Sequence, residues 1–285
     1  MFKILFISLI TSINANPRCS TATSVPKYHL IEPCHRSTLG IAARAKYSSL
    51  TSCKRLGIEK KALALNFSPT WNRSEPEYPC EVLKCSEAEG GLSLNNDTRY
   101  DYYSIYAKPI PNVNATCVPS IGMFYLLSRK LNYTNADDKC KNMSSTLADV
   151  NSEQRTDALA QFLTGAGVAT AFVGLKKDHE TRFIEVNGNG LDCTTYRAWA
   201  PGYPRRNRYH NCILLTKQHT WRTTSCENKQ QALCELIPHG PFKKGSIFKD
   251  KQNALIAALL IIDDVNTYIM NIFQDLTYFT KSEVL

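Results

Sequence analysis

The chain has 285 residues, of which 43% are hydrophobic and 21% are charged, a composition that supports a buried core and argues against wholesale disorder. Lysine and arginine number 34 against 25 acids, giving a net charge of +9, and the 11 cysteines leave at least one thiol without a partner in the same chain. No apolar run reaches the roughly 20 residues that a membrane-spanning helix needs.

The N-terminus is typical of a secretory signal peptide. Residues 1–15 place Lys3 before an apolar stretch from Ile4 to Ile10 and end at Ala15, after which we expect cleavage. Six Asn-x-Ser/Thr sequons indicate the same pathway, at Asn66, Asn72, Asn96, Asn114, Asn132 and Asn142. We therefore predict a secreted, extracellular glycoprotein whose cysteines form disulfides. Such a protein does not normally meet nucleic acid, so the positive charge indicates anionic glycans, matrix or solubility.

Residues 16–110 are predicted to form a small Cys-rich module. Helix-like spacing covers residues 39–56, and strand-like segments follow at 62–67, 80–85 and 100–106. The module weakly resembles a PAN/apple-type domain, mainly because Cys53 precedes Ala62–Phe67 and is followed by Cys80 and Cys85. A Cys-rich region specific to one family is the alternative.

A proline-containing linker at 111–116 leads to a second unit over residues 117–237. We predict a helix capped by Thr134, and a second helix that starts at the capping-box sequence Asn151–Gln154 and ends before Gly165 and Gly167. Short strands are expected at 147–150, 170–175, 213–215, 220–222 and 232–235. Residues 238–285 form a C-terminal tail whose apolar run is too short to span a membrane.

Several signals of the second unit occur together. Thirteen residues separate Cys212 from Cys226 and seven separate Cys226 from Cys234, while Trp221 stands five before Cys226. Cys140 lies in the first helix, Phe172–Leu175 in the middle strand and Trp199–Pro204 in a long loop. This combination resembles a C-type lectin-like domain over residues 117–237. The resemblance implies an α+β fold with two helices, antiparallel strands and a long loop, and the disulfides Cys140–Cys234 and Cys212–Cys226.

The partners of the other seven cysteines stay open. In one scheme, Cys117 and the five N-terminal cysteines form three disulfides. Six cysteines can pair in 15 ways, and the sequence does not distinguish between them. Cys193 is then the leading candidate for a free thiol or for a disulfide-linked dimer, and a Cys117–Cys193 bridge is a third possibility.

In sugar-binding members of the family, the long loop holds Ca²⁺ through a Glu-Pro-Asn or Gln-Pro-Asp triplet, a Glu and a Trp-Asn-Asp triplet. Calcium takes 6–8 oxygen ligands. The matching positions here are Tyr203, Arg205, His210, Arg222 and Thr223. Two arginines cannot be deprotonated to accommodate a dication, so we predict that the calcium site is lost. No metal or other cofactor is expected.

The same loop has no acidic residue between Asp192 and Glu227 but six basic ones. Because arginine pairs bidentately with sulfate and carboxylate, we predict a Ca²⁺-independent site for an acidic glycan or an acidic protein surface. Its predicted ligand-binding residues are Tyr203, Arg205, Arg206, Arg208, His210 and Arg222. The alternatives are a solvated basic loop without a dedicated ligand and protein binding without acid preference.

No Gly-rich phosphate loop, nucleophile elbow or HExxH motif occurs, so we predict a binding protein and not an enzyme. The predicted function is extracellular recognition of a glycan, with sulfated or acidic glycans as candidate ligands, or of an extracellular protein. The alternative is a structural component of matrix or barrier that crosslinks partners through its modules and Cys193.

Overall fold

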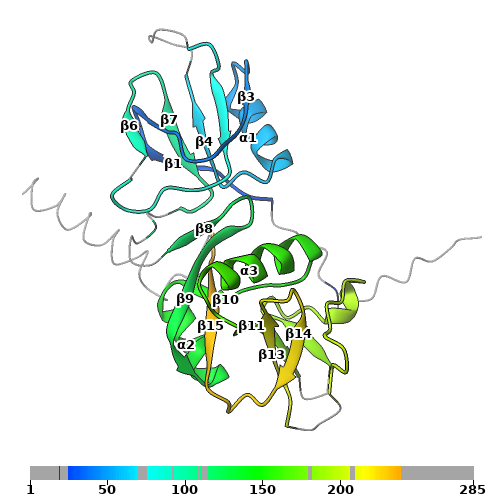
Figure 1. The fold of residues 1–285 in the computed structure, drawn as a ribbon. Helices are drawn as coiled ribbons and strands as arrows, with labels where there is room; N and C mark the ends of the chain where they lie inside the picture. The colour runs from blue at the N-terminus through cyan, green and yellow to red at the C-terminus, as the bar shows by residue number, and fades with distance from the viewer. Residues whose placement is uncertain are drawn as a thin grey trace, which may run out of the picture. The chain divides into compact units, whose positions relative to one another are not determined.

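The structure is a computed structural model that describes residue 19 and residues 25–69, 76–91, 93–107, 110, 115–178, 182–205 and 209–238. All of these residues belong to one compact unit, Met1–Gly240 (Figure 1). The predicted signal peptide, nearly all of the tail and most of the proline-containing linker lie outside the described residues. So do four of the predicted site residues, Asn72, Asn114, Arg206 and Arg208.

The N-terminal module (residues 25–110) is built on a five-stranded antiparallel sheet with the order β1-β7-β4-β5-β3. Helix α1 packs against β4 and β5, and β2 pairs with β6 in a separate small ribbon. The bounds are β1 His29–Glu32, β2 His35–Ser37, β3 Ile41–Ala45, α1 Leu50–Glu59, β4 Ala64–Phe67, β5 Cys80–Leu83, β6 Leu94–Asn96 and β7 Asp101–Ser104.

The three strands expected at 62–67, 80–85 and 100–106 are found as β4, β5 and β7. Every residue of β4 and β5 is buried, which explains why their sequences are mostly apolar. The predicted helix over 39–56 is wrong in its first half. Ile41–Ala45 pairs with β5 as an edge strand, and Ser49 begins the helix by accepting a hydrogen bond from the Ser52 amide at 3.1 Å.

The C-terminal part (residues 115–238) contains an eight-stranded sheet and two helices. The main path of the sheet is β14-β13-β11-β15-β9-β8, with β10 paired to β15 and β12 paired to β11. The bounds are β8 Thr116–Val118, β9 Gly122–Leu131, α2 Tyr133–Asn142, β10 Ser145–Leu147, α3 Glu153–Gly165, β11 Thr170–Lys177, β12 Phe183–Glu185, β13 Cys212–Thr216, β14 Trp221–Thr224 and β15 Gln230–Leu236, with a 3-10 turn at Leu191–Cys193.

Both predicted helices of this part exist, but each begins at a different cap residue. Asn132 caps α2, since its Oδ1 accepts a hydrogen bond from the Asn135 amide at 2.9 Å, and Thr134 lies inside the helix. Ser152 caps α3 through the Arg155 amide, one residue after the expected Asn151. The longest strand, β9, was not predicted.

The core of the C-terminal part lies between α3 and the sheet. Leu159 and Leu163 of α3 are fully buried in a cluster with Ile213, Leu215 and Trp221. Beside this core, β10 approaches β11 so closely that a Cβ on Gly174 would lie 2.7 Å from the Leu147 carbonyl oxygen. Glycine at this position is therefore required by the close approach of two strands.

Five disulfides link the described cysteines. Two of them, Cys140–Cys234 and Cys212–Cys226, are the pairs that the resemblance implies. The other three are Cys19–Cys193, Cys53–Cys80 and Cys85–Cys117. The expectation that Cys193 stays free or links a dimer is wrong, because Cys19 reaches it across 174 positions of sequence. Cys34 is the cysteine outside these five disulfides.

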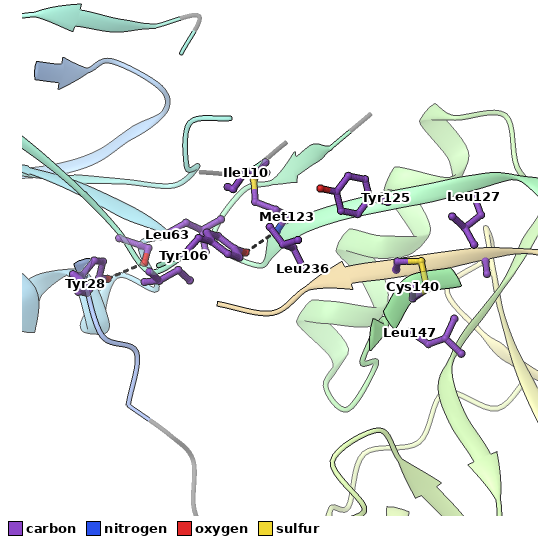
Figure 2. Packing of buried hydrophobic residues seen from close by; sticks show 14 of the residues in the cluster. Tyr28, Leu63, Tyr106, Ile110, Met123, Tyr125, Leu127, Cys140, Leu147 and Leu236 are labelled. Carbon is purple, nitrogen blue, oxygen red and sulfur yellow. Dashed lines mark hydrogen bonds between the residues drawn. A yellow bond between two sulfur atoms is a disulfide. The ribbon is translucent and has the colours of Figure 1, made fainter. Parts of the chain in front are cut away.

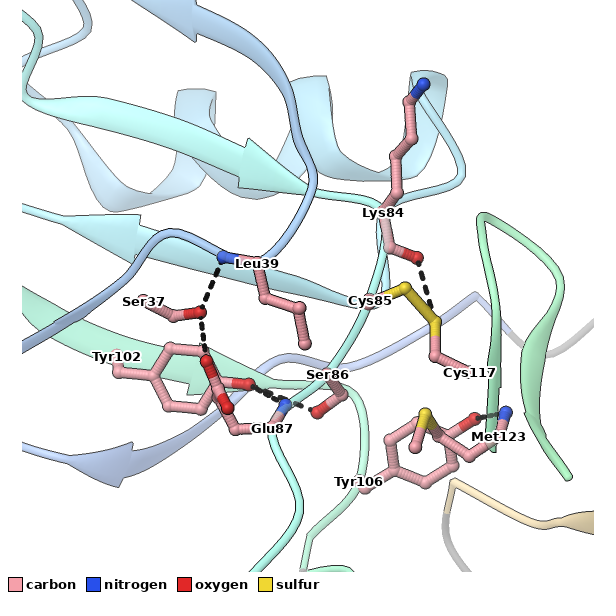
Figure 3. Close-up of a disulfide and its surroundings, with 10 residues drawn as sticks. All are labelled: Ser37, Leu39, Lys84, Cys85, Ser86, Glu87, Tyr102, Tyr106, Cys117 and Met123. Atoms are coloured by element: carbon pink, nitrogen blue, oxygen red, sulfur yellow. Dashed lines mark hydrogen bonds between the residues drawn. A yellow bond between two sulfur atoms is a disulfide. The ribbon is translucent and has the colours of Figure 1, made fainter. Parts of the chain in front are cut away.

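Contacts between the two parts are both covalent and noncovalent. The Cys85–Cys117 disulfide joins them (Figure 3), and the Ser120 amide donates to the Lys84 carbonyl at 2.9 Å. The buried hydroxyl of Tyr106 accepts a hydrogen bond from the Met123 amide at 2.9 Å, within an apolar cluster that has members from both parts (Figure 2). Among the described residues, no helix is long and apolar enough to cross a membrane.

Candidate functional site

The predicted site lies in the long loop that precedes β13, and aromatic packing holds the base of this loop. Trp221 of β14 is fully buried, and the ring of Trp199 meets it edge-on at 5.5 Å between centroids. The Trp221 amide donates to the Ala198 carbonyl at 2.7 Å, and the Ala200 amide donates to the Trp221 carbonyl at 3.0 Å. These bonds and the Cys212–Cys226 disulfide fix both ends of the loop against the sheet.

Three of the predicted ligand-binding residues meet around one aromatic ring. The guanidinium carbon of Arg205 lies 5.0 Å from the Tyr203 ring centroid, and that of Arg222 lies 6.0 Å from the same centroid. The backbone supports this arrangement, since the Arg205 amide donates to the Thr223 hydroxyl at 3.0 Å and the Tyr203–Pro204 peptide is cis. We call Tyr203, Arg205 and Arg222 the arginine–tyrosine cluster.

The arginine–tyrosine cluster presents unpaired positive charge to solvent. Arg205 and Arg222 are both exposed, and among the described residues neither forms an ion pair with a carboxylate. Guanidinium groups over an aromatic face keep their hydrogen-bond donors directed outward for an anion. The cluster is therefore equipped to receive a sulfate or carboxylate group.

The other basic residues of the loop have different positions. Arg197 donates from Nη1 to the carbonyl oxygens of Thr194 and Tyr196 at 2.8 and 2.6 Å, so its side chain stabilises the local backbone. His219 pairs through Nδ1 with the carboxylate of Asp157 on α3 at 2.7 Å. Sequence inspection missed this pair because the acid comes from a helix 62 positions earlier in the chain.

His210, another predicted ligand residue, is partly buried, and its Nδ1 has no hydrogen-bond partner in the described structure. It stands beside the exposed Tyr209, at the edge of the segment 206–208 that holds Arg206 and Arg208. The structure thus brings together three of the six predicted residues, and it does not place His210 in that contact.

The donor chemistry of the cluster does not fit calcium. Tyr203 and Thr223 offer neutral hydroxyl groups, and the Thr223 hydroxyl already accepts the Arg205 amide. The two guanidiniums nearby carry only donors, whereas calcium requires oxygen ligands. Within the described residues, no group of three or more His, Cys, Asp or Glu side chains is placed to hold a metal ion.

The described sequons differ in accessibility. Asn66 is fully buried, and its Nδ2 donates both hydrogens, to the Ser37 carbonyl at 2.7 Å and to the Glu81 carboxylate at 2.9 Å. A glycan replaces one of these hydrogens, so glycosylation at Asn66 would remove one of these two bonds. Asn96 and Asn142 are exposed, and Asn132 is partly buried as the cap of α2.

Comparisons with known proteins agree with this architecture. The family model described as "Lectin C-type domain" matches residues 129–236. Collectin-11 from Bos taurus is 26% identical over 164 residues, which are 56% of this chain and 59% of that protein. Collectin-10 from Gallus gallus is 25% identical over 116 residues, 40% of this chain and 41% of its own length. The matched segments thus span about half of these relatives.

Solved structures with a similar fold include human lithostathine, at 21% identity and a TM-score of 0.38 over 43% of this chain and 95% of that one. The carbohydrate-recognition domain of mouse scavenger receptor C-type lectin has 19% identity and a TM-score of 0.39 over 44% and 94% of the two chains. Residues 129–236 thus match the family model of the C-type lectin domain, and the described residues have an α+β fold. The comparisons give no support to the PAN/apple-like resemblance of the N-terminal module.

Proposed function

We propose that this protein is a secreted extracellular recognition protein whose C-type lectin domain (residues 117–237) binds acidic ligands without calcium. The observation that carries the proposal is the arginine–tyrosine cluster, where two exposed guanidiniums lie 5.0 and 6.0 Å from the centroid of one tyrosine ring. The Cys-rich module at 16–110 is attached to this domain by the Cys85–Cys117 disulfide. Five disulfides in one chain favour an oxidising compartment, in agreement with the predicted signal peptide.

The chemistry of the cluster favours a glycan that carries sulfate or uronate. Each guanidinium offers a planar fork of donors that matches two oxygens of one anionic group. The Tyr203 ring beside the two guanidiniums adds aromatic surface for contact with a sugar ring. Arg206, Arg208 and His210 extend the site in this proposal, and an acidic surface on an extracellular protein is the second ligand that suits it.

Binding to immobilised sulfated and unsulfated glycans, with EDTA present, tests the proposal. We expect sulfate-dependent binding that EDTA does not change and that weakens as salt concentration rises, because exposed charges are screened. The double variant Arg205→Gln with Arg222→Gln is expected to bind at least tenfold more weakly. Arg129→Gln with Arg55→Gln is the matched control, since both arginines are exposed and lie on β9 and α1.

Three results would contradict the proposal. They are binding that requires Ca²⁺, binding that ignores sulfation and ionic strength, and equal weakening by the two double variants. The last result would mean that net charge, and not the cluster, attracts the ligand.

The structural alternative, crosslinking through the modules and through Cys193, loses one of its two supports. Cys193 is joined to Cys19, and the role of the modules stays open to experiment. Gels run without and with reductant separate the two functions: a soluble monomer under both conditions agrees with recognition, and a disulfide-linked multimer agrees with a structural role.

A further inference from the structure

The N-terminal module contains a cavity of about 410 Å³ that is separate from the lectin loop. Its volume is within the range of roughly 300–1,000 Å³ that is typical of small-molecule sites. Apolar wall is contributed by Leu94 of β6 and by the ring of Tyr102 of β7. The exposed side chains of Glu32 and Glu89 also line it, which places the cavity in contact with solvent.

Hydrogen bonds hold the polar wall of the cavity in place. The buried Tyr102 hydroxyl accepts from the Glu87 amide at 2.8 Å and lies 3.2 Å from the Ser86 hydroxyl (Figure 3). The Ser37 hydroxyl donates to the Glu87 carboxylate at 2.5 Å, and the Ser93 hydroxyl donates to the same oxygen. The Glu87 carboxylate therefore occupies a fixed position before any ligand arrives, which lowers the entropic cost of binding.

The described lining offers strong hydrogen-bond acceptors. The described residues that line the cavity include three carboxylates, those of Glu32, Glu87 and Glu89, and none of them is lysine or arginine. His35 also lines the cavity. Its Nδ1 lies 2.8 Å from the Pro33 carbonyl oxygen, which only accepts, so Nδ1 carries a hydrogen.

We propose that this cavity binds an ammonium or guanidinium group carried on a small apolar body. Three carboxylates match a ligand that carries positive charge and only donates hydrogen bonds, and Tyr102 adds an aromatic side chain to the lining. A lone metal ion does not fit, because no described group of His, Cys, Asp and Glu side chains is placed to hold one. The charge preference is opposite to that of the arginine–tyrosine cluster, so the two sites are independent. A basic side chain of a protein and an amino sugar both supply the required group.

Titration of the full glycoprotein with two matched pairs of probes tests this proposal. The first pair is Nα-acetyl-lysine amide and its Nε-acetylated form, and the second pair is glucosamine and N-acetylglucosamine. Isothermal calorimetry measures the affinity, and the NMR signals of the Tyr102 and His35 rings report its location. We expect the cationic member of at least one pair to bind at least tenfold more tightly than its neutral partner, and the stronger pair identifies the source of the cation.

The double variant Glu32→Gln with Glu89→Gln is expected to weaken this binding at least tenfold. Both residues are exposed, so we expect the variant to keep the fold. The control is Glu59→Gln with Glu227→Gln, which removes the same charge from two exposed residues outside the cavity. Equal binding of charged and neutral probes, unchanged Tyr102 and His35 signals, or equal weakening by the control overturns the proposal. None of these results affects the sulfate-binding test.

Discussion

Asp149 follows β10, where three carboxylates and one arginine come together. Burial raises the pKa of Asp149 to about 6; Arg155 opposes this shift, and the carboxylates of Glu185 and Glu235 add to it. Arg155 is already paired with Glu235 and also donates from Nε to the Asp149 carbonyl oxygen at 3.0 Å. One guanidinium therefore does not compensate all three acids, and the ionised Asp149 side chain opposes folding at neutral pH.

This environment predicts a pH-dependent effect of Asp149→Asn on stability. The folded carboxyl keeps its proton at pH values where the unfolded one has lost it, so its contribution favours folding below about pH 4 and is lost as pH rises to about 6. We expect Asp149→Asn to raise the free energy of unfolding by about 1–3 kcal/mol at pH 7 and to leave it unchanged near pH 4. Urea unfolding at both pH values measures this.

Asp138→Asn is the control for that experiment, because Asp138 is exposed on α2. A gain in stability that is the same at pH 4 and pH 7, or that the control variant shares, would exclude the proposed cause.

Asn66 provides a second prediction at the level of single residues. Both hydrogens of its amide nitrogen are used by buried acceptors, and Glu81, one of those acceptors, also receives bonds from Arg36 and Arg44. We expect glycopeptide mass spectrometry of the secreted protein to find Asn66 unmodified and the exposed Asn96 and Asn142 glycosylated. A glycan on Asn66 in folded, monomeric protein would show that the described hydrogen-bond network is wrong.

At the scale of elements, the start of helix α2 is a place where the local capping preference and the tertiary contacts favour different cap residues. Asn132 and Thr134 both have side chains suited to capping, and the sequence favoured Thr134. In the structure Tyr133 is buried against Phe172, with their rings edge-on at 5.4 Å between centroids, and its amide donates to the Cys226 carbonyl at 2.9 Å. These contacts require Tyr133 to be the first helical residue, so Asn132 becomes the cap.

The two candidate caps are expected to respond differently to alanine substitution. Asn132→Ala removes the acceptor of the Asn135 amide and should cost about 1 kcal/mol of stability. Thr134→Ala is the matched control, because Thr134 is exposed within the first turn, and should change stability by less than about 0.5 kcal/mol. Chemical denaturation measures both, and a larger loss for Thr134→Ala would contradict the observed helix start.

The strands that sequence analysis found differ from those it missed in how continuously their residues are buried. Strand β11 was predicted as a buried apolar segment and β4 from the alternating segment at 62–67, and nearly all residues of both strands are buried. Residues 41–45 have helix-like spacing, yet pairing with β5 makes them a strand. Strand β9 begins with the apolar run Met123–Leu127 and ends with four residues that are exposed or partly buried, so no single pattern covers its ten residues.

At the scale of the whole molecule, disulfides connect parts of the chain that are distant in sequence. Cys19–Cys193 spans 174 positions, and Cys85–Cys117 links the N-terminal module to the C-type lectin domain. Cys19 lies four residues after Ala15, so cleavage at the predicted point would leave all ten disulfide-forming cysteines in the chain.

Proteolysis without reductant, followed by mass spectrometry, is expected to yield a peptide pair that joins Cys19 to Cys193. The reduced digest is the control and should release the two peptides separately. A Cys19–Cys34 pair, or Cys193 linked to a second molecule, would contradict the pairing and restore the structural alternative.

The sequence by itself indicated the C-type lectin domain through cysteine spacings and two tryptophans, and the resemblance to that family implied the disulfides Cys140–Cys234 and Cys212–Cys226. The loss of the calcium site stays a prediction that depends on the same resemblance. Only the tertiary structure decided that Arg205 and Arg222 share the Tyr203 ring, that Cys193 pairs with Cys19 and that Asn66 is buried. Each of these facts joins residues from separate segments, and the distance between such residues is set by the packing of the sheets and not by local sequence.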